Sequence, residues 1–203
     1  MALTAAVGTR AAVINVDNWV WRTSLNLKVD PLVNAARVVT TIFSPPVTVS
    51  VLLLVAAAAS RRQASWRPLL WAGVAATAMA VGTQALKMWL GRPGPGSLAA
   101  EKLNGAYPSG HTASLVLCGG AVVLVLGLHA LRTAWLSLAG LVLLVIGCLV
   151  YAHQHWLSDI LGSLLLSGAI LLWLAPRLAG PQRRRPRGAP QPADALADRD
   201  PLA

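Results

Sequence analysis

Residues 155–176 read HWLSDILGSLLLSGAILLWLAP, a polar opening followed by a long apolar run. From Trp156 onward the stretch carries one charged residue, Asp159, and it is long enough to cross a bilayer as a helix. Apolar runs over about 44–60, 68–90, 109–128 and 134–153 have the same character. The sequence therefore predicts an all-α fold, a polytopic transmembrane helical bundle of five or six spans.

The composition agrees with a membrane protein. Of the 203 residues, 56% are hydrophobic and only 12% are charged, whereas a soluble domain carries about a quarter charged residues. The net charge of +10 would suggest a nucleic-acid partner if the chain were soluble. Here the basic residues gather in short loops and in the C-terminal tail, where they set topology, so we expect no nucleic-acid partner.

Polar interruptions divide the chain into three parts. Residues 1–43 are predicted to form interfacial and lead-in helices, because Asp17, Arg22 and Arg37 interrupt their apolar stretches. Pro45 and Pro46 would kink the passage into the first span. Residues 44–176 would form the bundle, and residues 177–203, rich in Arg and Pro, a disordered basic tail.

The distribution of arginines predicts an orientation. Arg61, Arg62, Arg67 and Arg132 lie in loops on one side, together with the basic cluster at 177–187. By the positive-inside rule that side is cytoplasmic. The 91–108 loop and the 152–157 turn then share the opposite rim. We expect an integral protein of a bacterial plasma membrane whose active site faces outside and whose C-terminal tail is cytoplasmic.

The pair His155 and Asp159 is the first candidate for chemistry. A carboxylate at membrane depth is costly, which makes it a functional candidate by default. On a helix, residues four apart share one face. Asp159 can therefore accept the N–H of one imidazole nitrogen of His155 and leave the other nitrogen basic.

A second candidate lies at the start of the 109–128 span, in the sequence Pro108-Ser109-Gly110-His111. The free N–H groups of a helix N-terminus bind anions, and a glycine lets an oxyanion approach the backbone. Ser109 alone could be only an N-cap. His111 places an ionisable side chain in the first turn of a membrane span, and a capping role does not explain the free-energy cost of that placement.

Three cations lie near these motifs, namely Lys87, Arg92 and Lys102. Lys87 could simply snorkel to the interface from the end of its span. With Ser109 and Gly110 beside them, Lys87 and Arg92 are predicted to bind a phosphate. The prolines that follow Arg92 would stiffen the loop and fix where these cations point.

A metal site is the alternative use of His111 and His155. It lacks a third nitrogen or carboxylate ligand, because Asp159 is better placed behind His155, so we expect no metal and no cofactor. Cys118 and Cys148 fall in apolar runs and are expected to be small buried hydrophobic residues. His153 is expected to have a loop or interface role, and His129, at the cytoplasmic end, is expected to have no part in the chemistry.

These residues resemble the type 2 phosphatidic acid phosphatase family over about residues 40–176. The family pattern comprises Lys-x6-Arg-Pro, Pro-Ser-Gly-His and Ser-Arg-x5-His-x3-Asp. The residues that match it are Lys87 and Pro95 in the first motif, Pro108, Ser109, Gly110 and His111 in the second, and His155 and Asp159 in the third. Two family arginines are replaced, one by Gly94 and one by Leu149 (preceded by Cys148), while Arg92 lies two residues before the first of these positions.

The resemblance implies a metal-independent phosphatase that acts on a lipid or isoprenoid phosphate or diphosphate. His155 would form a phosphohistidine, oriented by Asp159, and His111 would protonate the leaving oxygen. Lys87, Arg92, Ser109 and Gly110 would hold the phosphate. The replaced arginines leave two alternatives: a divergent member with altered chemistry, such as a phosphotransferase, or a pseudoenzyme that binds lipid phosphates. A transporter or scaffold that uses the same rim is a third possibility.

Overall fold

The structure is a computed structural model that describes residues 11–96 and 105–179. These residues form helices and contain no strand. The elements are α2 (Ala11–Asn26), α3 (Asp30–Ile42), α4 (Pro45–Gln63), α5 (Arg67–Leu90), α6 (Gly110–Val125), the 3-10 helix η1 (Leu128–Ala130), α7 (Arg132–Tyr151) and α8 (Leu157–Leu178). Lys102 and residues 180–203 of the predicted tail lie outside the described residues.

Most of these helices are long and apolar enough to cross a membrane. In the described part of the chain this holds for α5, α7, α8 and the segment Asp30–Gln63, which comprises α3 and α4, whereas α6 is apolar but has only 16 residues. The prediction of an all-α, polytopic helical bundle is confirmed.

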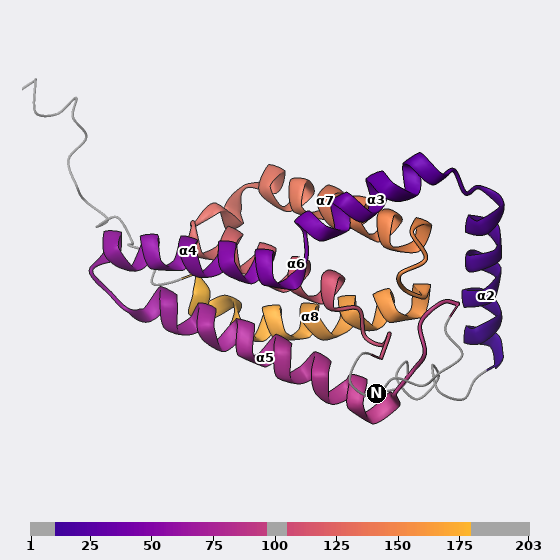
Figure 1. The fold of residues 1–203 in the computed structure, drawn as a ribbon. Coiled ribbons are helices and arrows are strands. Elements are labelled where there is room, and N and C mark those ends of the chain that lie inside the picture. The colour runs from indigo at the N-terminus through magenta and orange to yellow at the C-terminus, as the bar shows by residue number, and fades with distance from the viewer. Residues whose placement is uncertain (1–10, 97–104, 180–203) are drawn as a thin grey trace, which may run out of the picture.

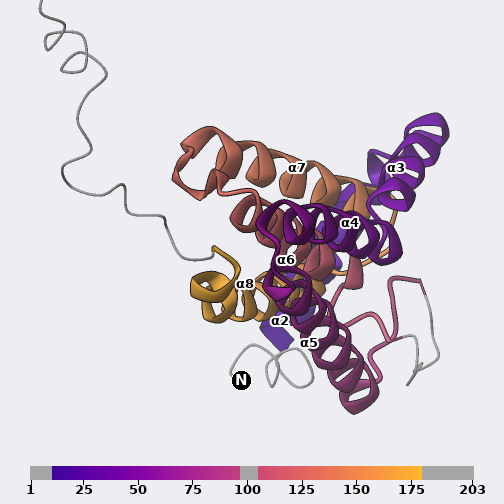
Figure 2. The same cartoon turned by 90° about the vertical axis from the view of Figure 1, so that its left-hand side faces the viewer.

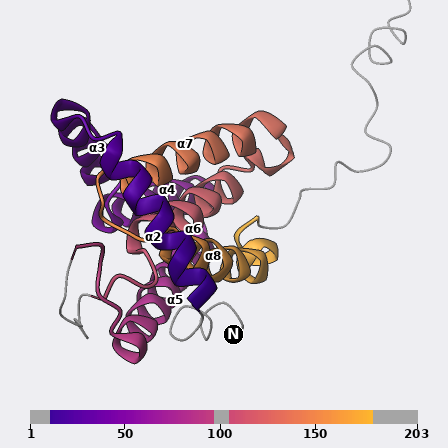
Figure 3. The same cartoon turned by 90° about the vertical axis from the view of Figure 1, so that its right-hand side faces the viewer.

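The short helix α6 lies at the centre of the bundle. Figure 2, viewed along the helices, shows α4, α5, α7 and α8 around it. Helix α3 runs beside α7, and α2 lies across one end of the bundle (Figures 1 and 3). That end collects the last turns of α5 and α7 and the first turns of α6 and α8, so residues far apart in sequence meet there.

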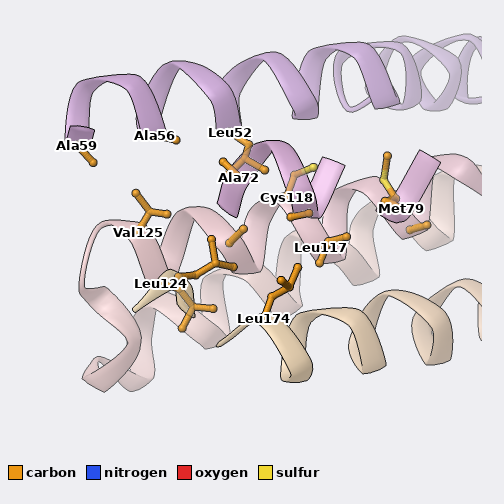
Figure 4. Packing of buried hydrophobic residues seen from close by; sticks show 14 residues of the cluster. Leu52, Ala56, Ala59, Ala72, Met79, Leu117, Cys118, Leu124, Val125 and Leu174 are labelled. Atoms are coloured by element: carbon orange, nitrogen blue, oxygen red, sulfur yellow. The ribbon is translucent and has the colours of Figure 1, made fainter. Parts of the chain in front are cut away.

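Small and aliphatic side chains fill the bundle's interior. One cluster joins α4, α5, α6 and α8 through fully buried residues such as Leu52, Ala72, Leu117 and Leu174 (Figure 4). Alanines let the helix backbones approach closely, as is typical of membrane helices. Cys118 is buried in this cluster, as expected, while Cys148 is only partly buried.

A second apolar cluster joins α6, α7 and α8. Its buried members are Leu115, Val142, Val145, Leu149 and Ile160. The cluster lies toward the end of the bundle where α7 finishes and α8 begins. Leu149 is 0% exposed in it.

Two predicted boundaries differ from the structure. The predicted 109–128 span ends earlier, at Val125, because Gly127 adopts a left-handed conformation with φ 72° and stops the helix. Helix α8 continues to Leu178, so its last turn includes the start of the predicted tail. The predicted break before the first span is present: α3 ends at Ile42 and α4 begins at Pro45, where a missing N–H costs nothing.

Candidate active site

The N-terminus of α6 presents the first half of the site. Ser109 is its N-cap, 0% exposed, and its Oγ lies 3.5 Å from the Thr112 amide nitrogen that donates to it. Gly110 begins the helix, and a Cβ built there would come to 3.5 Å from Cγ of Pro45. His111 follows in the first turn. The structure thus places this histidine beside free backbone N–H groups that favour an anion.

The start of α8 presents the second half, with a geometry that differs from the predicted one. Helix α8 begins at Leu157, so His155 precedes it and does not share a helix face with Asp159. Asp159 is in the first turn and its Oδ2 accepts the backbone N–H of Trp156 at 3.0 Å. A carboxylate is favoured in this position by the unpaired N–H groups and the helix dipole. The two residues come close because His155 lies in the loop just before α8 and the Asp159 side chain turns toward the N-terminus of that helix.

His155 and Asp159 are in contact without a well-aligned hydrogen bond. The His155 Nδ1 atom lies 3.5 Å from Asp159 Oδ2, within ion-pair range. Nδ1 is buried and has no hydrogen-bond partner among the described residues. Hydrogen bonds in active sites are often long without substrate and tighten only when it binds.

The two halves bring His111 and His155 together. Their ring centroids are 6.2 Å apart and the rings are inclined at 66°. The predicted convergence of two distant segments is therefore present at one end of the bundle. At this separation the two rings face each other edge to face, so one small group at their shared edge could reach both.

Arg92, which follows α5, is held by carboxylates. Its Nη1 lies 2.6 Å from Asp159 Oδ1 and 2.6 Å from Ser158 Oγ, and its Nη2 lies 2.7 Å from Asp17 Oδ2. The guanidinium also lies 5.5 Å from the ring centroid of Trp156. The prediction that Arg92 binds phosphate stays a prediction, and its present partners are two acidic side chains.

Sequence reasoning did not assign chemistry to Asp17. It was noted only as a polar interruption in an N-terminal helix. Asp17 is now found 3% exposed and in contact with the site. The usable signal was its charge, since an acid inside an apolar stretch needs a partner.

Lys87 lies in the last turn of α5, and its Nζ donates to the carbonyl oxygen of Gly105. The loop on either side is tied down as well. The amide of Ala106 donates to the Arg92 carbonyl at 2.8 Å, and Trp156 Nε1 donates to the Pro93 carbonyl at 2.9 Å. The bond from Trp156 holds the loop after Arg92 near the start of α8, while the other two bonds tie Lys87 and Arg92 to residues 105 and 106.

The two positions of the replaced family arginines are structurally unlike. Among the described residues, a Cβ built on Gly94 would come within 4 Å of Ala106 Cβ alone, at 3.9 Å. Leu149 is enclosed in the second apolar cluster. The described residues therefore leave space at one arginine position, and the other has become part of the hydrophobic core.

A cavity of about 320 Å³ adjoins Asp17 and Arg92. It lies between α2 and the end of α5 and is lined by residues that include Asp17, Asn18, Leu90, Arg92 and Trp156. No three His, Cys, Asp or Glu side chains of the described residues converge on a point where a metal ion could bind.

His153 lies in the loop between α7 and α8, as expected, with a positive φ of 56°. Its Nε2 is 3.0 Å from the Ser24 hydroxyl of α2. Burial lowers the pKa of His153, and the cations Lys28 and Arg37 lower it further. His153 therefore links α2 to the loop that carries His155.

An all-helical membrane bundle with an imidazole pair at a helix N-terminus defines a class of integral membrane proteins. Residues 68–180, more than half of the chain, match the family profile described as the PAP2 superfamily, and the chain belongs to this superfamily. No curated protein matches the chain. The predicted resemblance is confirmed by the family match.

The fold is similar to one solved structure, described as the crystal structure of the first transmembrane PAP2 type phosphatidylglycerolphosphate phosphatase from Bacillus subtilis. The TM-score is 0.77 at 20% sequence identity, with 91% of this chain and 94% of the other chain covered. At this identity the likeness establishes the shared fold.

Proposed function

We infer that the protein is an integral-membrane phosphatase that hydrolyses a lipid or isoprenoid phosphate or diphosphate through a phosphohistidine. The observation that carries this proposal is the 6.2 Å separation of the His111 and His155 rings, with Asp159 behind His155. Membership of the PAP2 superfamily supports it, as does the likeness to a protein described as a phosphatidylglycerolphosphate phosphatase.

The reaction proceeds in two displacements. Nε2 of His155 attacks phosphorus, an N–P bond forms, and the bond from phosphorus to the lipid oxygen breaks. His111 gives its proton to that leaving oxygen. Water then loses a proton to His111 and attacks the same phosphorus, and the N–P bond breaks. Inorganic phosphate leaves, and both histidines return to their starting protonation states.

The site residues supply the charge stabilisation that phosphoryl transfer requires. Asp159 orients His155 and stabilises its cationic form. Lys87, Ser109 and the Gly110 N–H receive the charge that develops on the phosphoryl oxygens, with Arg92 as a further candidate. These groups supply proton transfer and electrostatic stabilisation from the chain itself, so we propose a metal-independent reaction.

The position of the site suits a substrate with an apolar tail. The site lies at one end of a membrane bundle, the end where α5 finishes, and Trp89 in the last turn of α5 is exposed. Arg61 and Arg62 are at the other end, in the last turn of α4. The positive-inside rule then supports an active site outside a bacterial plasma membrane and a C-terminal tail inside.

Phosphate release from a panel of lipid and isoprenoid phosphates, in detergent with a chelator, tests this proposal. We expect wild type to turn over at least one substrate and His155→Ala to be inactive. A phosphorylated protein that is labile in acid and stable in base should be trapped with wild type only. His129→Gln, altered far from the site, serves as the control and should retain activity. Full turnover by His155→Ala would contradict the mechanism.

A second candidate function is phosphoryl transfer to an acceptor other than water, or lipid-phosphate binding without turnover. Two observations favour it: Leu149 is buried in the core, and Arg92 is paired with acids. Adding an acceptor alcohol distinguishes transfer from hydrolysis, because transfer yields a new phosphate ester. Binding without any phosphate release would indicate a pseudoenzyme.

A further inference from the structure

Asp17 is a buried acid on a helix that the bundle does not need for spanning the membrane. It lies in the middle of α2, which crosses the end of the bundle where the site lies (Figures 1 and 3). The side chain is 3% exposed. A buried carboxylate is costly unless it is fully paired, so its presence here needs a reason.

Both carboxylate oxygens of Asp17 have partners. Oδ1 accepts the backbone N–H of Ser158 at 2.9 Å. Oδ2 lies 2.5 Å from the Ser158 hydroxyl and 2.7 Å from Arg92 Nη2. Anchoring α2 to the Ser158 amide needs only a hydrogen-bond acceptor, which a neutral side chain could provide. The negative charge is needed for Arg92.

Arg92 also contacts Asp159, the acid behind His155. Its Nη1 is 2.6 Å from Asp159 Oδ1, while the other oxygen of Asp159 faces His155 Nδ1. Four groups therefore lie in a row, Asp17, Arg92, Asp159 and His155. The guanidinium between two carboxylates is only 13% exposed, and charge-assisted bonds in such surroundings fix side-chain positions strongly.

We propose that Asp17 is a positioning residue for catalysis: through Arg92 and Ser158 it holds Asp159 in place behind His155. This inference rests on the proposed phosphatase function. In this arrangement Arg92 contacts the carboxylate behind His155 and does not bind the phosphate. Without the charge of Asp17 the Nη2 side of the guanidinium loses its ion pair, and Asp159 is oriented less firmly. Helix α2 is then a component of the active site.

The first test compares the steady-state kinetics of Asp17→Asn with wild type. The amide keeps the size of the side chain and can still accept from the Ser158 N–H. We expect kcat to fall by about 10–100-fold, as is usual when a group that orients a reacting side chain is lost. KM and inhibition by orthophosphate should change by less than about twofold, because substrate binding is untouched. Asp17→Glu, which keeps the charge, should recover part of kcat.

Asp30→Asn is the matched control. Asp30 is on neighbouring α3, its side chain is 84% exposed, and its partner is Lys28. This variant removes an acidic side chain from the N-terminal part of the chain and leaves the four groups from Asp17 to His155 unchanged, so kcat should stay at the wild-type value.

A double variant separates positioning from simple anchoring of α2. If Asp17 acts through Arg92, then Asp17→Asn should add little to the kcat loss caused by Arg92→Gln. Should Asp17→Asn not fold, Ser158→Ala gives an independent reading, since it removes the hydroxyl contacts to both Asp17 and Arg92 while keeping the backbone bond. It should lower kcat and leave KM unchanged.

Three results would overturn the proposal. One is an unchanged kcat in Asp17→Asn and Ser158→Ala. Another is a raised KM and weaker phosphate inhibition at constant kcat, which would place Arg92 on the phosphate. The third is full additivity of the Asp17 and Arg92 losses. Failure of the phosphatase function itself looks different, because wild type would then release no phosphate.

Discussion

The backbone N–H of Ser109 donates to the carbonyl oxygen of Asp159 across 3.2 Å. The Ser163 hydroxyl reinforces this link, since its Oγ lies 2.9 Å from the Ser109 carbonyl oxygen and 2.7 Å from that of Asp159. The start of α6 and the first turn of α8 are thus joined through their backbones. The distance from the amides at the start of α6, which we propose bind the phosphate, to the carboxylate of Asp159 is set by the scaffold, which is how a precise site is held.

His111 is proposed to protonate the leaving oxygen and later to activate water. We expect His111→Asn to reduce turnover of an alkyl phosphate by about 10²–10⁴-fold. With nitrophenyl phosphate, whose leaving group needs no proton, a first-turnover burst of nitrophenol should persist while steady-state turnover stays slow. Stopped-flow absorbance, at an enzyme concentration high enough for a single turnover to be visible, measures this burst. Loss of the burst as complete as the loss of turnover would assign His111 another role.

Gly162 of α8 packs against Tyr107, the residue before Pro108. A Cβ at position 162 would lie 2.4 Å from the Tyr107 Oη and 2.5 Å from two ring carbons. Tyr107 is 2% exposed, so the ring has little room to move. We expect Gly162→Ala to destabilise the protein by about 1–3 kcal/mol through overpacking and to lower activity by shifting Ser109.

Gly168 on the same helix is the matched control. A Cβ there meets no atom of the described residues within 4 Å. Gly168→Ala should be neutral or slightly stabilising, because alanine favours helix. Unfolding midpoints in detergent compare the two variants. Equal unfolding midpoints would show that the Tyr107 ring moves aside without destabilising the protein.

The two positions of the replaced arginines should respond in opposite ways. Gly94→Arg has space beside Ala106. It should tighten inhibition by orthophosphate or vanadate, with a charge-assisted bond contributing about 1.5–3 kcal/mol. Gly94→Gln is the neutral control. Unchanged inhibition in Gly94→Arg would mean that the anion binds elsewhere.

Leu149→Arg should not restore phosphate binding. The guanidinium would enter the apolar cluster that contains Val145 and Ile160, without an acidic partner in that cluster. A buried unpaired charge is strongly destabilising. We expect poor folding and a lowered unfolding midpoint, and a stable variant with tighter vanadate inhibition would contradict this.

Stability should depend on pH through His153. Burial first, and then Lys28 and Arg37, lower the pKa of His153 in the folded protein below its usual 6.5. In the folded state its neutral form is favoured, so the unfolded chain binds the proton at higher pH. The contribution to stability is complete above about pH 6.5 and falls as the pH drops below that value toward the folded pKa.

His153→Asn should reduce this pH dependence. Asparagine tolerates the positive φ of 56° at this position and cannot titrate. Unfolding midpoints at about pH 7.5 and about pH 5.5 should differ less in the variant than in wild type. An identical pH response in both proteins would show that other groups dominate.

The sequence predicts the parts of this structure that depend on local patterns. Apolar run length located α4, α5, α7 and α8, and the Ser-Gly pair located the N-terminus of α6. The partners of Arg92 were not predictable, because Asp17 lies 75 residues away and on a helix whose placement depends on tertiary packing. The helical spacing of His155 and Asp159 suggested a shared face, yet the side chain of Asp159 instead folds back on the N-terminus of α8.

The length of α6 has a consequence for the surrounding lipid. Its 16 residues span roughly 24 Å, less than the roughly 30 Å of hydrocarbon in a typical bilayer. His111 lies in the first turn of this short helix, so with the proposed function a phosphate bound there would lie below the headgroups of a bilayer of ordinary thickness. The protein would then require a locally thinner bilayer, so we expect lower activity in bilayers with longer acyl chains. Activity in vesicles that does not change with acyl-chain length would contradict this expectation.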